Sequence, residues 1–110
     1  MDSNENTLPK KLIYKYFSSL VNCFFKILPI KENGEESLTK YVESLRDEMM
    51  GARNLMILDA IDCDARYLTL LAILQNLIDD PNYSVKKTKR DVFRAINICN
   101  SLKDQYGKDE

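Results

Sequence analysis

The sequence predicts an all-α protein, folded as a single-domain antiparallel (up-down) bundle of four helices. Apolar residues recur at helical spacing along most of the 110 residues, whereas the alternation typical of strands is absent. Only three glycines and three prolines interrupt the chain, which favours long helices. The connections are short, and short connections make successive helices antiparallel neighbours. This length corresponds to one domain that can bury a core of its own.

The first predicted helix covers residues 8–28. Its apolar residues fall on a wide stripe of 3.6-residue period, and lysines occupy the other side. Thr7 can cap the beginning of this helix, and Pro9 suits its first turn because the missing N–H has no partner there. Pro29 is expected to end the helix, and residues 29–36 are expected to form a turn.

The second predicted helix covers residues 35–58. Acidic residues in its first turn complement the positive end of the helix dipole. Gly51 lies within the apolar pattern, where glycine costs about 1 kcal/mol relative to alanine. The pattern therefore leaves open whether the helix is continuous through Gly51, is kinked there, or approaches another backbone closely.

The third predicted helix covers residues 63–79 and contains the most apolar stretch of the chain, residues 65–78. No charged residue lies between Arg66 and Asp79, and apolar side chains occupy nearly every side of the helix. Such a helix is typical of a buried position, so we expect the other helices to enclose it. Asp62 is the expected N-cap.

The last predicted helix covers residues 84–106. Ser84 is the expected N-cap, and Gly107 is placed where a C-terminal cap belongs. The apolar stripe of this helix includes Phe93, which is therefore expected to face the core. Residues 1–7 and 107–110 are expected to be frayed tails.

The composition removes the usual catalytic arrangements. The chain has no histidine and only three scattered glycines, so it offers no histidine-based catalytic group and no glycine-rich phosphate loop. We therefore expect no enzymatic activity, no cofactor and no metal site. Paired carboxylates leave one alternative, a divalent-metal carboxylate hydrolase acting on nucleotides. The pairs at suitable spacing are Glu32 with Glu35, Asp59 with Asp62, and Glu43 with Asp47.

The cysteines and the hydropathy indicate a soluble, cytoplasmic protein. Cys23, Cys63 and Cys99 lie in apolar periods and are expected to be buried free thiols in a reducing compartment. The longest uncharged run, residues 67–78, is much shorter than the ~20 residues that a membrane-spanning helix needs. We expect no membrane association and no small-molecule substrate.

Residues 86–94, KKTKRDVFR, form a strongly basic run at the beginning of the last helix. Cations are unfavourable at this end of a helix dipole, which suggests a use other than stability. Three interpretations remain open: a solvated surface, a contact for DNA or RNA with a helix-turn-helix-like outline, or a contact for an acidic protein. The residues concerned are Lys86, Lys87, Lys89, Arg90 and Arg94.

The favoured interpretation of function is a small protein–protein interaction or regulatory module without catalytic activity. The first predicted helix carries more aromatic residues than one core-facing side requires. If the bundle leaves Tyr14 and Phe25 uncovered, they form an apolar interface. Homodimerisation through this interface is the first expectation, and nucleic-acid binding through residues 86–94 is the principal alternative.

Overall fold

The computed structural model describes residues 10–33, 35–55, 61–80, 82 and 84–107, and confirms the predicted all-α helical bundle. The expectations for residues 1–9, 56–58 and 108–110 and for the turn at Gly34 lie outside the described residues. The helices are α1 (Lys10–Phe25), α2 (Ile27–Asn33), α3 (Glu35–Leu55), α4 (Ile61–Asp79) and α5 (Val85–Gly107).

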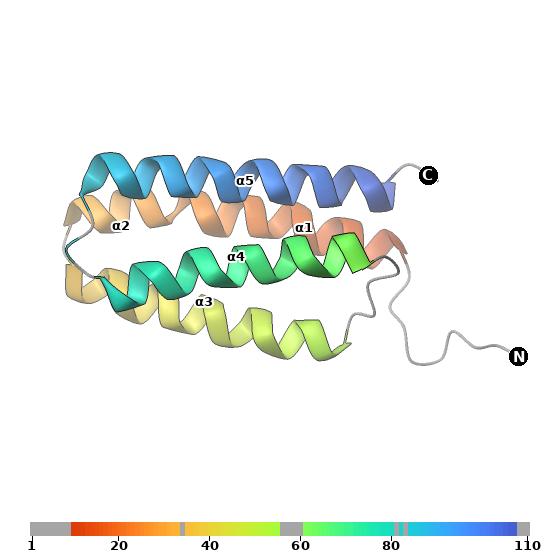
Figure 1. The fold of residues 1–110 in the computed structure, drawn as a ribbon, viewed down its shortest axis with the longest axis horizontal. Coiled ribbons are helices and arrows are strands. Elements are labelled where there is room, and N and C mark those ends of the chain that lie inside the picture. The colour runs from red at the N-terminus through yellow and green to blue at the C-terminus, as the bar shows by residue number, and fades with distance from the viewer. Residues whose placement is uncertain (1–9, 34, 56–60, 81, 83, 108–110) are drawn as a thin grey trace, which may run out of the picture.

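Figure 1 shows α1 and α2 following one course, after which α3, α4 and α5 alternate in direction. Side-chain contacts agree with this view for α1 and α5, the first and last helices. Phe17, early in α1, stacks on Tyr106, late in α5, whereas Phe25 contacts Phe93. The two helices are therefore antiparallel neighbours.

The predictions that Pro29 ends the first helix and that residues 29–36 form a turn are wrong, because Ile27–Asn33 is helical and α3 begins at Glu35. Pro29 lies in the first turn of α2, where its missing N–H is tolerated. The helical pattern is interrupted at Lys26 alone, because the proline ring crowds the carbonyl of Phe25 four residues earlier and cannot donate to it. Backbone hydrogen bonds around the break keep α1 and α2 in line. The Lys26 N–H donates to the Asn22 carbonyl at 3.1 Å.

Helix α3 is continuous through Gly51. A Cβ placed on this glycine would meet no atom within 4 Å, so no other backbone approaches it. Two side chains from the C-terminal half of α3 hold this helix against α4. Arg46 donates to Gln75 at 3.1 Å, and Arg53 makes a bidentate ion pair with Asp64. The guanidinium of Arg53 lowers the pKa of the Asp64 carboxyl.

The expectation that residues 65–78 are enclosed by the other helices is wrong. Helix α4 buries Tyr67, Leu70 and Leu74 completely, but Leu68 is 44% exposed and Ala72 is also exposed. Each helix of a four-helix bundle has a core-facing side and an outer side, and an apolar outer side does not change that geometry. The helix begins at Ile61, so Asp62 lies inside it and is not the N-cap.

The core is one cluster that draws on all five helices. Phe17 of α1 lies between Tyr67 of α4 and Tyr106 of α5, with ring centroids 6.1 and 6.3 Å away. Such aromatic pairs add about 0.5–1.5 kcal/mol beyond their buried area. The largest fully buried side chains are Tyr67, Phe17, Phe24, Ile27, Met49, Leu70, Leu74, Leu102, Val42, Val92, Thr88 and Cys99.

A chain of hydrogen bonds between tyrosines crosses this core. The Tyr67 hydroxyl donates to the Met49 carbonyl at 2.7 Å, and the hydroxyls of Tyr16 and Tyr67 lie 2.9 Å apart. Because the single proton of Tyr67 is committed to Met49, Tyr16 is the donor to Tyr67. The chain joins α1, α4 and α3 and satisfies polar groups whose burial unpaired would be costly.

Burial also makes the folded protein sensitive to alkaline pH. Desolvation raises the pKa of Tyr16 to about 12, and desolvation raises the pKa of Tyr67 further. Unfolded tyrosines ionise near pH 10, so the unfolded state releases these protons first as the pH rises.

We therefore expect the free energy of unfolding to be unaffected by these tyrosines below about pH 10 and to fall as the pH rises toward 12. Urea unfolding at a series of pH values measures this fall. A free energy that stays constant between pH 9 and pH 12 would contradict the burial of these hydroxyls.

Candidate nucleic-acid interface

The basic run begins directly after the N-cap of α5. The Ser84 hydroxyl accepts the Lys87 N–H at 3.0 Å, which confirms the predicted cap. All five cations of the run have exposed side chains. An open depression of about 390 Å³ at this end of α5 is lined by Ser84, Lys86, Lys87 and Arg90.

The run does not form one continuous site, because helical spacing distributes it over two sides of α5. Lys86 and Phe93 are seven residues apart and share a side, and Phe93 contacts Phe25 of α1. Arg94 shares its side with Ser101, which accepts a hydrogen bond from Arg66 of α4 at 2.6 Å. Lys86 and Lys89 therefore lie toward α1, and Lys87 and Arg94 lie toward α4.

Phe93 was expected in the core but lies at its edge. Its ring is 40% exposed and packs edge-on against Phe25, which is 43% exposed, with centroids 6.0 Å apart. The buried side of α5 comprises Thr88, Val92, Ala95, Ile96, Cys99, Leu102 and Tyr106. The stripe was predicted one position too wide, because apolar character alone does not separate the centre of a helical stripe from its margin.

The other predicted interface residue, Tyr14, is half-buried against the core. The ammonium of Lys103 lies 5.8 Å from the centroid of its ring, a cation–π contact between α1 and α5. Of the two aromatic residues predicted as an interface, Phe25 is the exposed one.

Helix α1 adds exposed basic residues to this surface, along the line where α1 packs against α5 (the seam between the two helices). Its exposed Lys11, Lys15, Asn22 and Phe25 recur at intervals of three, four or seven residues, so they line one side of the helix. The helix contains three lysines and no acidic residue. Phe25 and Tyr14 contact Phe93 and Lys103 of α5, which places this side of α1 next to α5.

The exposed residues along this side of α1 and the exposed residues of α5 that lie toward α1 together define the α1–α5 face. It comprises exposed residues of α1, of the break that follows it, and of α5: Lys11, Lys15, Asn22, Phe25, Lys26, Lys86, Lys89, Arg90, Phe93 and Asn97. Sequence reasoning found the α5 half and missed the α1 half, because the α1 lysines were assigned to a solvated side. The signal that could have found them is that Lys11 and Lys15 share one side of the helix with Asn22 and Phe25.

The near-zero net charge conceals a separation of charge between helix pairs. The segments 10–33 and 85–107 contain basic residues at 10, 11, 15, 26, 31, 86, 87, 89, 90, 94 and 103, and acidic residues at 32, 91 and 104. The segments 35–55 and 61–79 contain acidic residues at 35, 36, 43, 47, 48, 62, 64 and 79, and basic residues at 40, 46, 53 and 66. The α1–α5 side is therefore electropositive and the α3–α4 side electronegative.

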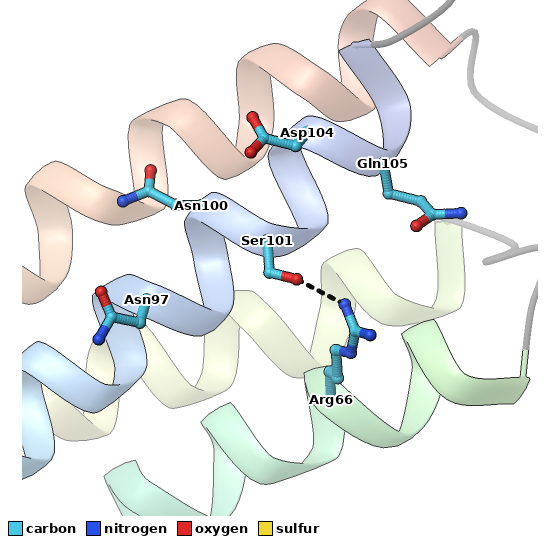
Figure 2. Close-up of a pocket in the computed structure, with 6 residues that line it drawn as sticks. All are labelled: Arg66, Asn97, Asn100, Ser101, Asp104 and Gln105. Atoms are coloured by element: carbon cyan, nitrogen blue, oxygen red, sulfur yellow. Dashed lines mark hydrogen bonds between the residues drawn. The ribbon is translucent and has the colours of Figure 1, made fainter.

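A second, more polar depression of about 500 Å³ lies on α5 beside α4. Figure 2 shows Ser101 turned toward Arg66 of α4, and Asn100 and Asp104 on the other side of α5. The depression is lined by residues that are exposed or half-buried: Arg66, Asn97, Asn100, Ser101, Asp104 and Gln105. It is a shallow depression that is open to solvent.

The three cysteines are free thiols that lie partly or fully inside the bundle. Cys63 and Cys99 are buried, and Cys23 is half-buried. Desolvation, with a smaller contribution from Cys23, raises the pKa of the Cys99 thiol to about 12, which suppresses its reactive thiolate.

No group of three or more His, Cys, Asp or Glu side chains that could hold a metal ion occurs in the described part of the chain. Asp59 and the side chains of Glu35 and Asp62 lie outside the described residues. Within the same part of the chain, no helix combines the length and apolarity required to cross a membrane.

Comparisons with known proteins give no relative from which a function could be transferred. No family model, no curated protein and no solved structure matches the chain.

A substitution at Lys86 can measure how much a cation at the beginning of α5 lowers the free energy of unfolding. It lies in the first turn of α5, where the helix dipole and the neighbouring cations both disfavour a positive charge. We expect Lys86→Glu to raise the free energy of unfolding by about 0.5–1 kcal/mol at low salt, as measured by urea unfolding.

Arg94→Glu is the matched control, because this exposed residue of α5 lies beyond the reach of the dipole. It should give a smaller increase or none. Equal changes for the two variants, or a loss of stability with Lys86→Glu, would contradict a dipole penalty at the beginning of α5.

Proposed function

We propose that this protein is a non-catalytic nucleic-acid-binding module and that the α1–α5 face is its binding surface. The observation that carries the proposal is the gathering of exposed cations from both ends of the chain around the Phe25–Phe93 pair. Lysine and arginine side chains on one face neutralise phosphates and release counterions, which is the main source of sequence-independent affinity.

The character of the face favours nucleic acid over a protein partner. Protein interfaces have an apolar core of aromatic and aliphatic residues and are depleted in lysine. Here the exposed apolar surface centres on two rings, with Lys26 beside Phe25 and Lys89 and Arg90 one turn before Phe93. Cations interspersed with aromatic rings are typical of nucleic-acid surfaces.

The mode of binding differs from a helix-turn-helix. That motif sets its two helices at about 90–120°, with the second helix in the major groove. Helices α4 and α5 instead run side by side in opposite directions (Figure 1). The cations therefore lie along the side of a helix pair, and they can follow a phosphate backbone without a recognition helix.

A protein partner is the second candidate, and the exposed Phe25–Phe93 pair is the observation that favours it. An isologous homodimer through this pair would bring Lys26, Lys89 and Arg90 against the same basic surface of the second copy. Like charges facing each other across an interface cost affinity. The charge of the face fits an acidic partner better than a second copy.

We expect the protein to bind labelled oligonucleotides with an affinity that falls steeply as salt rises, with a dissociation constant of about 1–100 µM at physiological salt. Lys89→Glu and Lys26→Glu should each weaken binding and reduce the slope of log affinity against log salt by about 1. Fluorescence anisotropy at several salt concentrations measures both quantities.

Lys40→Glu is the matched control, since it makes the same charge change at an exposed lysine of α3. It should leave affinity and slope nearly unchanged. Equal weakening by Lys40→Glu would indicate an effect of net charge alone, and an affinity independent of salt would overturn the proposal. Selective capture of acidic proteins, without oligonucleotide binding, would transfer the function to the second candidate.

A further inference from the structure

The Phe25–Phe93 pair differs from the other aromatic side chains of the described residues. Every other described phenylalanine or tyrosine is buried or half-buried, whereas these two rings are 43% and 40% exposed. They come from helices far apart in sequence and meet edge to face, with an interplanar angle of 83°. The bundle therefore holds two aromatic rings side by side at its surface, at the seam between α1 and α5.

The residues around the pair can contact both parts of a nucleotide. Asn22 precedes Phe25 by one helical turn and Asn97 follows Phe93 by one turn, and both are exposed. Their amides can donate to and accept from the edges of a base. Lys26 directly follows Phe25 and Lys89 precedes Phe93 by one turn, and both can reach a phosphate.

We infer that Phe25 and Phe93 form a stacking platform for unpaired bases, so that the α1–α5 face binds single strands in preference to duplexes. The inference rests on the proposed function and adds the class of nucleic acid to it. In a duplex, neighbouring bases cover one another, and these rings could reach a base only by separating a base step. In a single strand the base faces are free to stack on aromatic side chains.

The arrangement of charges is consistent with a strand that follows the seam. Lys11 and Lys15 lie toward one end of the α1–α5 pair, and Lys86 and Lys89 toward the other, with the two rings nearer the second group. A flexible single strand can contact phosphate-binding residues at both places and still turn bases onto the rings. Stacking is tolerant of sequence, because every base has a π-face.

The experiment compares three probes of equal length by anisotropy: a homothymidine strand, a duplex, and an abasic strand that keeps the phosphates but lacks the bases. The homothymidine strand should bind about tenfold more tightly than the other two at the same salt. Equal or tighter binding of the duplex would overturn the inference, as would equal binding of the abasic strand.

Phe25→Leu and Phe93→Leu remove the aromatic ring but keep an apolar side chain at the seam. Each should reduce the affinity for homothymidine toward that for the abasic strand, while the slope of affinity against salt stays unchanged. Leu68→Ala, which truncates an exposed apolar residue of α4, is the control and should have no effect. Thermal unfolding establishes that each variant is folded before its binding is compared.

The outcomes separate the two proposals. If no probe shows salt-dependent binding, the proposed function fails. If all probes bind alike, Lys89→Glu weakens binding and the phenylalanine variants behave as the wild type, nucleic-acid binding stands and the stacking platform is wrong. Loss of single-strand preference in the phenylalanine variants alone supports the inference.

Discussion

The packing of the first helix against the last is the constraint on which the surface of this protein depends. Phe17 stacks on Tyr106 in the core, Lys103 lies over Tyr14, and Phe25 meets Phe93 at the surface. These contacts fix α1 and α5 antiparallel along one seam. Two basic stripes, separated by most of the chain, thereby become one face.

The interior and the surface contribute differently to stability and function. In the core, the hydroxyls of Tyr16 and Tyr67 form a chain of hydrogen bonds that ends on the Met49 carbonyl. At the beginning of α5, in contrast, cations occupy the end of the helix where the dipole disfavours them. A local feature that opposes stability, on an otherwise consistent fold, is where a functional constraint is expected.

The fold could be predicted because helical periodicity is a local signal. The N-cap at Ser84 followed directly from its position before an apolar helical period. Pro29 was misjudged because proline stops a helix only when it lies beyond the first turn, and the break at Lys26 restarts the helix two residues before Pro29. The position of α4 was misjudged because an apolar outer side does not force burial.

The candidate site was only half predictable, for a tertiary reason. Lys86 and Lys89 stood out as part of a dense run, whereas Lys11, Lys15 and Lys26 are scattered through a helix and look like solvated residues. These lysines become part of the candidate site only because the bundle packs α1 against α5. The same holds for Phe93, whose exposure depends on where the edge of α1 lies.

The central claim is that one binding face is built from both ends of the chain, and backbone amide chemical shifts during titration with a homothymidine strand test it most directly. The account predicts shifts that follow α1 around Phe25 and Lys26 and α5 from Lys86 to Asn97, with α3 unaffected. Shifts confined to the beginning of α5, or centred on α3 and α4, would contradict it.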